Sequence, residues 1–431
     1  MRAGPTRERR SEAGKPRRAM LRPRGGLIAA LDIGTTKTCC LIARVEADEP
    51  QVIGIGHQVS RGLRGGAIVD LEAAGTALRT AVRDAEEMAG EEIKEVVANL
   101  SGGFSASRVV KAEIDIAGHE VGDTDLRHVL EQGYRLREPG DRQVVHSVPI
   151  GFSIDEGRGI RDPRGMFGER LGVDMHLVSA AAGAVRNQTS AIGRAHLELD
   201  ALVVSPYAAG LGVLVEDELA LGVSVIDMGG GTTTIGVFFD GNLIFAGSVP
   251  VGGSHVTNDI ARGLSTPLAH AERLKTLHGS AIASLADERE SLAVPQVGED
   301  EAHATQVPKS LLVGIIAPRL EETFELVRNR LEASGFDKLA GRRIVLTGGA
   351  CQLQGARDLA ALVLDKQVRV GRPLGVKGLS EASAGPAFAT GVGLLHFALS
   401  EHAEVARSRP GSDDLPGGLL GRVGHWLREN F

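Results

Sequence analysis

The sequence has 431 residues, of which 42% are hydrophobic and 24% are charged, and its formal net charge is −7. A chain of this length exceeds what one simple hydrophobic core accommodates, so we expect two or more lobes. No apolar run reaches the roughly 18 residues that a membrane-spanning helix requires, and no secretory apolar segment follows the basic start. The three cysteines and thirteen histidines have no metal-ligand spacing, which argues against a disulfide framework or a zinc site.

Charge is unevenly distributed along the chain. Residues 1–25 hold nine Arg and Lys against two Glu, a composition typical of a disordered arm. Arms of this kind can bind nucleic acid or lipid, but we expect an incidental extension and no nucleic-acid partner. Residues 401–416 are polar and contain proline, which is typical of a linker.

The first half of the chain begins with an α/β pattern that is then interrupted. In chain order we expect a hairpin at 27–45, a strand at 51–56, an amphipathic helix near 71–89 and a strand at 96–100. Residues 102–173 change character, with short strands, a charged helix near 123–137 and many Gly, Asp and Arg. We interpret this segment as an inserted small domain, after which helices and strands resume at 176–215.

A second hairpin is expected at 221–239 and opens another α/β block. Residues 254–341 are mostly helical, with a low-complexity patch at 285–308 that we interpret as a loop or hairpin. The stretch R-I-V-L-T-G-G-A at 343–350 predicts a buried strand that runs into a glycine turn, and helix follows.

The two hairpins resemble each other. The first reads L-I-A-A-L-D-I-G-T-T-K-T-C-C-L-I-A-R-V and the second reads L-G-V-S-V-I-D-M-G-G-G-T-T-T-I-G-V-F-F. Each is an apolar strand, an Asp, an apolar residue, a Gly, a turn of small residues and a second apolar strand. The two copies lie about 195 residues apart, and each opens an α/β block.

Both hairpins carry the residue types that hold a chain of phosphates. Glycine turns let backbone N–H groups approach phosphate oxygens closely, and a carboxylate at the end of the preceding strand can hold Mg²⁺ or its water shell. A third glycine turn, Thr347 to Ala350, offers a flat surface suited to an adenosine. One such pattern is weak, because glycine turns often follow strands, but three in this order indicate nucleotide binding. The competing patterns G-x-x-x-x-G-K-[ST] and G-x-G-x-x-G after a strand are absent.

The order of these motifs resembles the actin-like ATPase superfamily and, within it, the bacterial cell-division FtsA family. The motifs that carry the resemblance are S-R-G-L-R-G-G-A-I-V-D (60–70), N-L-S-G-G (99–103), V-I-D-M-G-G-G-T-T (225–233), G-L-S-T-P-L-A-H-A-E-R-L-K (263–275), I-V-L-T-G-G-A (344–350), G-V-G-L-L-H (391–396) and the final W-L-R-E-N-F. Together they extend over most of the chain, roughly residues 27–431.

The resemblance implies an α/β fold of the actin-like ATPase type, with two lobes that each contain a mixed sheet flanked by helices. It implies these parts: a basic disordered arm (1–25), subdomain 1A (26–101 and 174–220), an inserted SHS2-like subdomain 1C (102–173), subdomain 2A (221–253 and 342–400), subdomain 2B (254–341), the linker (401–416) and an amphipathic membrane-targeting helix (417–431).

The same resemblance assigns roles to residues around ATP. The first phosphate loop would contain Asp32, Gly34, Thr35, Thr36 and Lys37, and the second Asp227, Gly229, Gly230, Gly231 and Thr232. Asp32 and Asp227 would hold Mg²⁺ through water, with Asp227 nearest the γ-phosphate. Adenosine contacts would come from Gly348, Gly349 and Ala350, and from Glu272 and Lys275 on one helix face. For Glu272 and Lys275, an ordinary solvated ion pair remains the alternative.

The resemblance leaves the question of enzymatic activity open. The stretch V-S-P-Y-A-A-G at 204–210 resembles a turn that carries an acidic residue in the chaperones of the superfamily, and Ser205 stands at the acidic position. Serine can hydrogen-bond a water but is a poor base near neutral pH. We therefore expect ATP binding with slow or negligible turnover, and no confident catalytic residue.

The final stretch, G-G-L-L-G-R-V-G-H-W-L-R-E-N-F, predicts an amphipathic helix. At 100° per residue its apolar side chains cover an arc of about 140°. The membrane-facing residues would be Leu419, Leu420, Val423, Trp426, Leu427 and Phe431, flanked by Arg422 and Arg428. So short a helix is mostly unfolded in water and would fold on a lipid surface, weakly for one copy and firmly for a polymer. The alternative is a helix packed on its own domain.

The resemblance therefore predicts an ATP-binding protein that polymerises and tethers the FtsZ ring to the inner face of the cytoplasmic membrane at the division septum. Later division proteins would bind subdomain 1C. The C-terminal peptide of FtsZ would lie on subdomain 2B near Lys309, Arg319 and Arg328, unless these are solvated helix charges. The alternatives are a sugar kinase or exopolyphosphatase of the same superfamily, a chaperone-type ATPase, and a PilM-like pilus-assembly protein.

Overall fold

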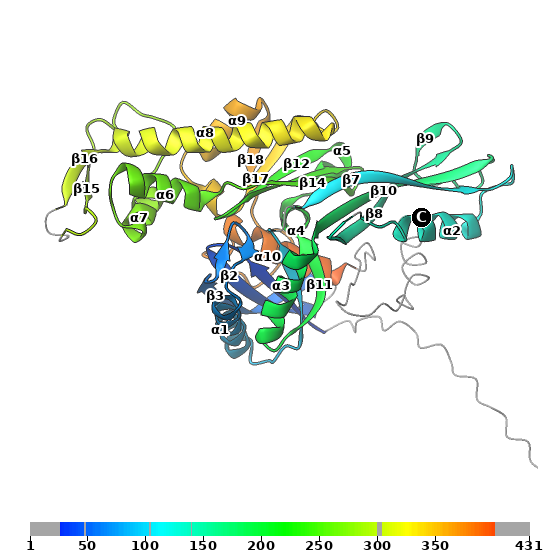
Figure 1. Ribbon diagram of the computed structural model, residues 1–431, viewed down its shortest axis with the longest axis horizontal. Coiled ribbons are helices and arrows are strands. Elements are labelled where there is room, and N and C mark those ends of the chain that lie inside the picture. Colours follow the sequence, from blue (N-terminus) through cyan, green and yellow to red (C-terminus); the bar gives the residue numbers. More distant parts are fainter. Residues whose placement is uncertain (1–25, 47–48, 103–104, 139, 300–303, 401–431) are drawn as a thin grey trace, which may run out of the picture.

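The computed structural model describes residues 26–46, 49–102, 105–138, 140–299 and 304–400. These residues form two lobes and a smaller domain, which projects at the opposite end of the molecule from the hairpin β15–β16 (Figure 1). The basic arm, the linker and the C-terminal amphipathic helix expected from the sequence lie outside the described residues.

Each lobe is built on a five-stranded mixed sheet, and the two sheets share one topology. The first lobe has the order β3-β2-β1-β6-β11, with β1 Leu27–Ile33, β2 Lys37–Glu46, β3 Glu49–Val59, β6 Glu95–Leu100 and β11 Glu198–Val204. The second has the order β14-β13-β12-β17-β18, with β12 Val223–Met228, β13 Thr233–Phe239, β14 Asn242–Val249, β17 Arg343–Thr347 and β18 Gln367–Val370. Three strands form an antiparallel meander in each sheet, and the first of them pairs in parallel with a later strand. The repeated hairpins of the sequence thus form the corresponding strands of two equivalent sheets.

The helices of the first lobe cover its sheet on two sides. They are α1 Leu71–Ala89, α3 Ala182–Arg194, α4 Ser205–Val213 and α10 Ala389–Leu399. Helix α1 begins where Asp70 Oδ1 accepts the N–H groups of Glu72 and Ala73, both at 3.0 Å, and ends at Gly90, whose φ is 67°. Its buried residues recur at helical spacing, so the sequence predicts both the helix and the face that packs against β2 and β3.

The second lobe carries a helical layer and a small hairpin. Its helices are α6 Gly253–Gly263, α7 Leu268–His278, α8 Lys309–Ser334 and α9 Ala356–Leu364, and the short helix α5 Glu216–Leu221 leads into it. The low-complexity patch contains the antiparallel strands β15 Ser291–Val294 and β16 Thr305–Pro308. A 3-10 turn, η2 Gly349–Gln352, follows β17 directly, as the glycine turn of the sequence predicts.

The inserted domain has its own four-stranded sheet and core. Strands β7 Ala106–Asp115, β8 Arg142–Ile154, β9 Gly157–Ile160 and β10 Arg170–Ala181 pair in the order β7-β10-β8-β9, and α2 Asp123–Tyr134 packs on them. The expected boundary at residue 173 falls inside β10, so it must move toward Ala181. The reason is that β10 pairs with β7 and β8 along almost its whole length before the chain returns to the first lobe at α3.

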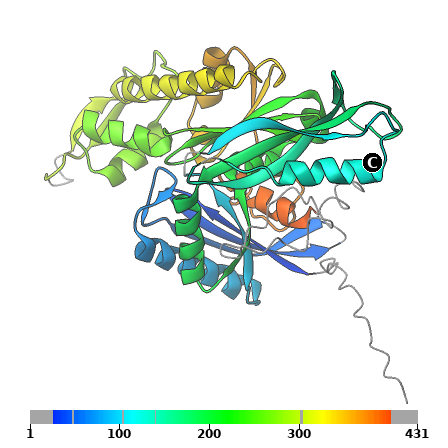
Figure 2. The ribbon, with the colours of Figure 1, turned by 45° about the vertical axis from the view of Figure 1, so that its right-hand side comes forward.

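Helix α10 requires a second correction, because it belongs to the first lobe and not with the 342–400 segment of subdomain 2A. Its side chains Ala389, Val392 and Leu395 are fully buried in the core of the first lobe, against α4 and β1. Figure 2 shows this helix, in orange, against the blue strands of that lobe. The chain crosses back through the 3-10 turn η3 Pro386–Phe388 because a helix that is apolar nearly all round needs burial on every side. In the part of the chain that the structure describes, no helix is long and apolar enough to span a bilayer.

Candidate functional site

The two hairpins that the sequence singles out end in the same turn. In the first, the Gly34 N–H donates to the Lys37 carbonyl at 2.9 Å, and in the second the Gly229 N–H donates to the Thr232 carbonyl at 3.0 Å. Each turn follows a strand whose second-last residue is an aspartate, Asp32 or Asp227. The repeat in sequence is therefore a repeat in backbone geometry.

The turns meet where the lobes face each other. A methyl group added at Gly230 would lie 2.4 Å from Thr36 Cγ2, and one added at Gly231 would lie 2.3 Å from Thr35 Oγ1. Only glycine lets the backbone of the second turn approach the threonine side chains of the first so closely, which explains the glycines at 230 and 231. The Gly66 N–H, between β4 Leu63–Arg64 and β5 Ala67–Ile68, also donates to Thr35 Oγ1 at 2.8 Å. Motif 60–70 therefore forms a further wall of this site.

Asp32 is held by its own lobe. Its Oδ1 accepts a hydrogen bond from Asn99 Nδ2 at 2.9 Å, and Asn99 Oδ1 in turn accepts the Ile33 N–H at 2.7 Å. Asn99 lies on β6, the parallel neighbour of β1, and is 1% exposed. Burial raises the pKa of Asp32, and the Lys37 ammonium, 4.0 Å from Oδ2, opposes that shift.

Asp227 is held across the cleft. Its Oδ2 accepts a hydrogen bond at 3.1 Å from Thr390 Oγ1, which lies on α10 of the first lobe. Burial and the nearby charge of Asp32 raise the pKa of Asp227 to about 7, although Thr390 and Lys37 favour its charged form. On the other side of the carboxylate, a methyl group added at Gly348, whose φ is 87°, would lie 2.3 Å from Asp227 Oδ1.

The donor set fits a divalent cation together with phosphate. Burial raises the pKa of both carboxylates, the charge of Asp32 raises that of Asp227 further, and Lys37 is the cation that opposes the shift at both. Among the described residues, no group of three or more His, Cys, Asp and Glu could hold a metal by itself. A cation that takes one or two carboxylates and completes its shell with water and phosphate oxygens matches this pair, as Mg²⁺ does.

Lys37 connects the first turn to the segment before α10. Its ammonium donates to the Ala387 carbonyl and lies 3.9 Å from the centroid of the Phe388 ring. The Lys37 side chain therefore already has partners in the protein, and a phosphate would compete with them for its charge.

The proposed adenosine side is assembled from three elements. Lys275 Nζ donates to Glu272 Oε2 at 2.6 Å, to Thr257 Oγ1 at 2.9 Å and to the Gly253 carbonyl at 3.2 Å. A methyl group added at Gly253 would lie 3.1 Å from Ala350 Cβ, so α6, α7 and the glycine turn after β17 converge here. The Gly253 N–H also donates to the Gly229 carbonyl at 3.0 Å, which joins this side to the glycine turn of the second hairpin. The structure thus brings together the predicted residues Glu272, Lys275 and Ala350.

Hydroxyl and amide groups surround Ser205, the residue that stands where the superfamily's chaperones carry an acidic group. Ser205, at the start of α4, shares a 2.7 Å hydrogen bond with Ser101 Oγ, and both accept from Asn99 Nδ2 at 3.1 Å. The nearest carboxylate in this network is that of Asp32, which Asn99 engages as well. In the described part of the chain this network contains no free base beside Ser205.

The three cations of α8 expected to bind a partner peptide do not converge on one surface. Arg319 binds Asp259 on α6 at 2.5 Å, whereas Arg328 donates to the Val363 carbonyl on α9 at 3.0 Å. Nine residues separate them, which is about half a turn out of phase on a helix, so they face opposite sides. Lys309 pairs with Glu290 at 3.0 Å and with Asp287 at 3.6 Å.

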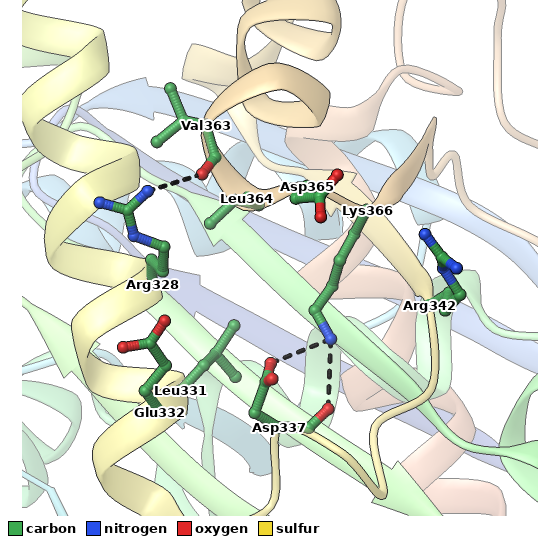
Figure 3. A pocket seen from close by; sticks show the side chains of 9 residues that line it. All are labelled: Arg328, Leu331, Glu332, Asp337, Arg342, Val363, Leu364, Asp365 and Lys366. Atoms are coloured by element: carbon green, nitrogen blue, oxygen red, sulfur yellow. Dashed lines mark hydrogen bonds and ion pairs between the residues drawn. The ribbon is translucent and has the colours of Figure 1, made fainter.

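A cavity of about 480 Å³ lies near the end of α8, away from the cleft (Figure 3). Arg328 lines it together with Arg342, Lys366 and acidic residues, and Lys366 Nζ lies 2.9 Å from Asp337 Oδ1. Its lining holds equal numbers of acidic and basic side chains, so its charge does not favour an acidic ligand.

Sequence reasoning missed the residues that orient the two aspartates. Asn99 belongs to the quoted motif N-L-S-G-G, but nothing in that motif indicates its partner 67 residues away. Thr390 directly precedes the quoted motif G-V-G-L-L-H and is one of two polar residues in an otherwise apolar helix. A buried polar residue in an apolar helix is the signal that could have identified it.

Comparison with protein-family models matches residues 224–393 to "Cell division protein FtsA" and residues 102–179 to the SHS2 domain inserted in FtsA, which agrees with the extent of β10. The cell division protein FtsA of Rhizobium meliloti (strain 1021) is 47% identical over 422 residues, which cover 95% of this chain and 96% of that protein.

Solved structures share the fold at low identity. A chain of a PilM–PilN type IV pilus biogenesis complex has a TM-score of 0.62 and 18% identity, covering 88% of this chain and all of that one. MreB5 of Spiroplasma citri bound to ADP has a TM-score of 0.50 and 15% identity, covering 87% of this chain and 97% of that one. These likenesses confirm the expected actin-like ATPase fold, and the sequence identity to relatives decides the family. The chain belongs to the FtsA family of bacterial cell-division proteins.

Proposed function

We propose that this chain binds ATP and Mg²⁺ between its two lobes and acts as a membrane tether for the FtsZ ring. The observation that carries the nucleotide part is the contact between two equivalent strand–turn units, each with an aspartate at its strand end. The tethering part rests on membership of the FtsA family and on the amphipathic pattern of residues 417–431, which lie outside the described residues.

Within this site the chain's own residues bind and orient. The backbone N–H groups of the two glycine turns would hold the phosphate oxygens, and Lys37 would exchange its Ala387 and Phe388 contacts for a phosphate. Asp32 and Asp227 would hold Mg²⁺ through water, and Glu272 and Lys275 would face the ribose and adenine. When bound, the cation would neutralise phosphate charge and relieve the repulsion between the two carboxylates.

Turnover is proposed to be slow. Ser205 occupies the position where a chaperone-type ATPase carries an acidic group, and its hydroxyl is hydrogen-bonded to Ser101 and Asn99. A hydroxyl in such a network can orient a water but does not accept its proton efficiently at neutral pH. A steady-state rate above about 1 s⁻¹ for the pure protein, lost in Asp227→Ala, would contradict this assignment.

The assembly part of the proposal is a filament on the cytoplasmic face of the inner membrane at the septum. Leu419, Leu420, Val423, Trp426, Leu427 and Phe431 would enter the lipid, with Arg422 and Arg428 at the head groups. One such helix binds weakly, so polymerisation would supply affinity through avidity. Later division proteins would dock on the inserted domain.

The FtsZ peptide is proposed to bind the second lobe near α8. Its acidic residues would have to displace the acidic partners that Lys309 and Arg319 hold, whereas Arg328 faces the opposite side of the helix. A charge-dependent contact of this kind would weaken with salt.

Co-sedimentation with liposomes tests these parts together. The full chain should pellet with vesicles, carry FtsZ with it, and do so more efficiently with ATP and Mg²⁺ than without nucleotide. A variant with Trp426→Glu and Leu427→Glu should stay in the supernatant, while the control His425→Gln should behave like the unaltered chain. Equal pelleting of both variants would contradict the membrane helix, and pelleting without FtsZ recruitment would contradict the tether.

A further inference from the structure

Thr390 stands out among the buried polar residues around the cleft. It lies in the first turn of α10, it is 6% exposed, and the helix around it is otherwise almost entirely apolar. A buried hydroxyl in such a helix is destabilising unless it is hydrogen-bonded. Threonine in a helix commonly bonds a backbone carbonyl one turn earlier, but the Thr390 hydroxyl donates to the carboxylate of Asp227.

The bond between Thr390 and Asp227 crosses from one lobe to the other. The donor lies on α10, whose apolar side chains pack in the core of the first lobe, and the acceptor lies near the end of β12 in the second lobe, 163 residues away in sequence. The carboxylate has little freedom elsewhere, because Gly348 approaches Oδ1 so closely that a methyl group there would lie 2.3 Å away. The orientation of Asp227 is therefore set from two sides.

The segment that carries Thr390 is anchored to both lobes. The Gly348 N–H of the second lobe donates to the Pro386 carbonyl at 3.2 Å, and the Thr347 hydroxyl is shared between that carbonyl at 3.3 Å and the Gly371 carbonyl at 3.1 Å. Lys37 of the first lobe donates to the carbonyl of the next residue, Ala387. The start of α10 is thus fixed by contacts from either side of the cleft, and it holds the hydroxyl in place.

We propose that Thr390 is a positioning residue that orients Asp227 across the cleft, so that Asp227 is ready to hold the cation only when the lobes are closed. This inference rests on the proposed Mg²⁺-nucleotide site. Asp32 needs no such partner, because Asn99 of its own lobe orients it whatever the position of the second lobe. Closure of the lobes and cation binding would therefore be coupled through one hydroxyl group.

The test compares nucleotide affinity with and without Mg²⁺ in three full-length variants. Thr390→Val keeps the shape and removes the hydroxyl, Thr390→Ser keeps the hydroxyl, and Thr323→Val removes a buried helical hydroxyl whose partner is the Arg319 carbonyl. A fluorescent ATP analogue is titrated in excess Mg²⁺ and again in EDTA. The readout is the dissociation constant in EDTA divided by the dissociation constant in Mg²⁺. This ratio reports on the cation and not on folding or general packing.

We expect Thr390→Val to lower this ratio about tenfold, the value of a typical hydrogen bond to a charged group, with affinity in EDTA unchanged. Thr390→Ser and Thr323→Val should keep the ratio of the unaltered chain. An unchanged ratio in Thr390→Val would overturn the inference, and so would an equal loss of affinity with and without Mg²⁺. If the unaltered chain bound no nucleotide in either condition, the proposed function would fail and the inference with it.

Discussion

The two repeated hairpins share turn geometry and sheet topology, yet their aspartates are held differently. Asp32 is bound by Asn99 on a neighbouring strand of the same sheet, whereas Asp227 is bound by Thr390 from the other lobe. A carboxylate oriented within one rigid sheet keeps its direction when lobes move, but one oriented across a cleft does not. The two aspartates are therefore equivalent in sequence and topology, but movement of the lobes would change the orientation of only one of them. The carboxylate of Asp227, in the second hairpin, is the one that would respond to closure of the lobes.

The largest expected effect comes from removing either charge. Asp32→Asn and Asp227→Asn keep size and hydrogen-bonding capacity, and each should weaken Mg²⁺-dependent nucleotide binding on the order of 100-fold because a cation loses one of two carboxylates. The nucleotide-free proteins should unfold at a higher temperature than the unaltered chain, since one of two mutually repelling buried charges is gone.

Binding calorimetry with Mg²⁺ and thermal unfolding without nucleotide check both statements. Glu321→Gln on the surface of α8 is the matched control for loss of one negative charge. Full Mg²⁺ dependence in Asp32→Asn would mean that the first aspartate is not a cation-holding residue, and the two hairpins would then differ in function as well.

The next effect tests the contact between the turns. A methyl group at Gly231 would already lie 2.3 Å from Thr35 Oγ1, and the larger side chain of Gly231→Val would collide with it. The lobes should therefore separate, and nucleotide affinity should fall at least about tenfold. Each sheet remains intact, and circular dichroism should show an unchanged secondary structure.

Gly314→Ala provides the control, because nothing lies within 4 Å of a methyl group at this position of α8. It should leave affinity unchanged and stabilise the helix by about 0.5–1 kcal/mol. Nucleotide affinity retained in Gly231→Val would show that the cleft can open without loss of the site.

Asn99→Ala sharpens the comparison within the first lobe. It leaves the Ile33 N–H and Asp32 Oδ1 without their partner, and a buried polar group left unsatisfied costs about 2 kcal/mol in the free energy of unfolding. Urea denaturation measures this loss. Gln188→Ala is the control, since Gln188 donates to the Asn99 backbone carbonyl and does not touch Asp32. Both variants should lose stability, but only Asn99→Ala should also lower the Mg²⁺ dependence of nucleotide affinity. An equal Mg²⁺ dependence in Asn99→Ala and Gln188→Ala would contradict the orienting role of Asn99.

The last effect concerns the fold outside the nucleotide site and is expected at acid pH. His146 and His176, on β8 and β10, are buried where the inserted domain meets both lobes, and burial lowers their pKa values to about 3 and about 4. Below the ordinary pKa near 6.5 the unfolded chain takes up protons that the folded chain does not. Stability is therefore full above this pH and falls as pH decreases toward 4, by up to about 1.4 kcal/mol per unit for each histidine.

Urea denaturation between pH 7 and pH 5 measures this loss. His146→Gln should remove one histidine's share of the slope, and His128→Gln, at an exposed position of α2, is the matched control. A slope that does not change in His146→Gln would mean that other groups cause the acid loss.

Local patterns predict much of this molecule because their causes are local. The two D-x-G turns, the helix at 71–89 with its cap at Asp70, and the approach of Glu272 to Lys275 depend on spacing within a few residues. The repeated hairpin predicted two similar blocks, and the sheets share one strand order. The motif order was specific enough to indicate the family that the relatives confirm.

Tertiary structure alone decided what the local patterns do not contain. The return of α10 to the first lobe, the continuation of β10 beyond residue 173, and the partners of Asp32 and Asp227 all join residues far apart in the chain. Periodicity shows that α10 must be buried, but not which core will bury it. The local sequence therefore predicts the two aspartates with their glycine turns. The packing of the lobes decides that Asn99 binds Asp32 and that Thr390 binds Asp227.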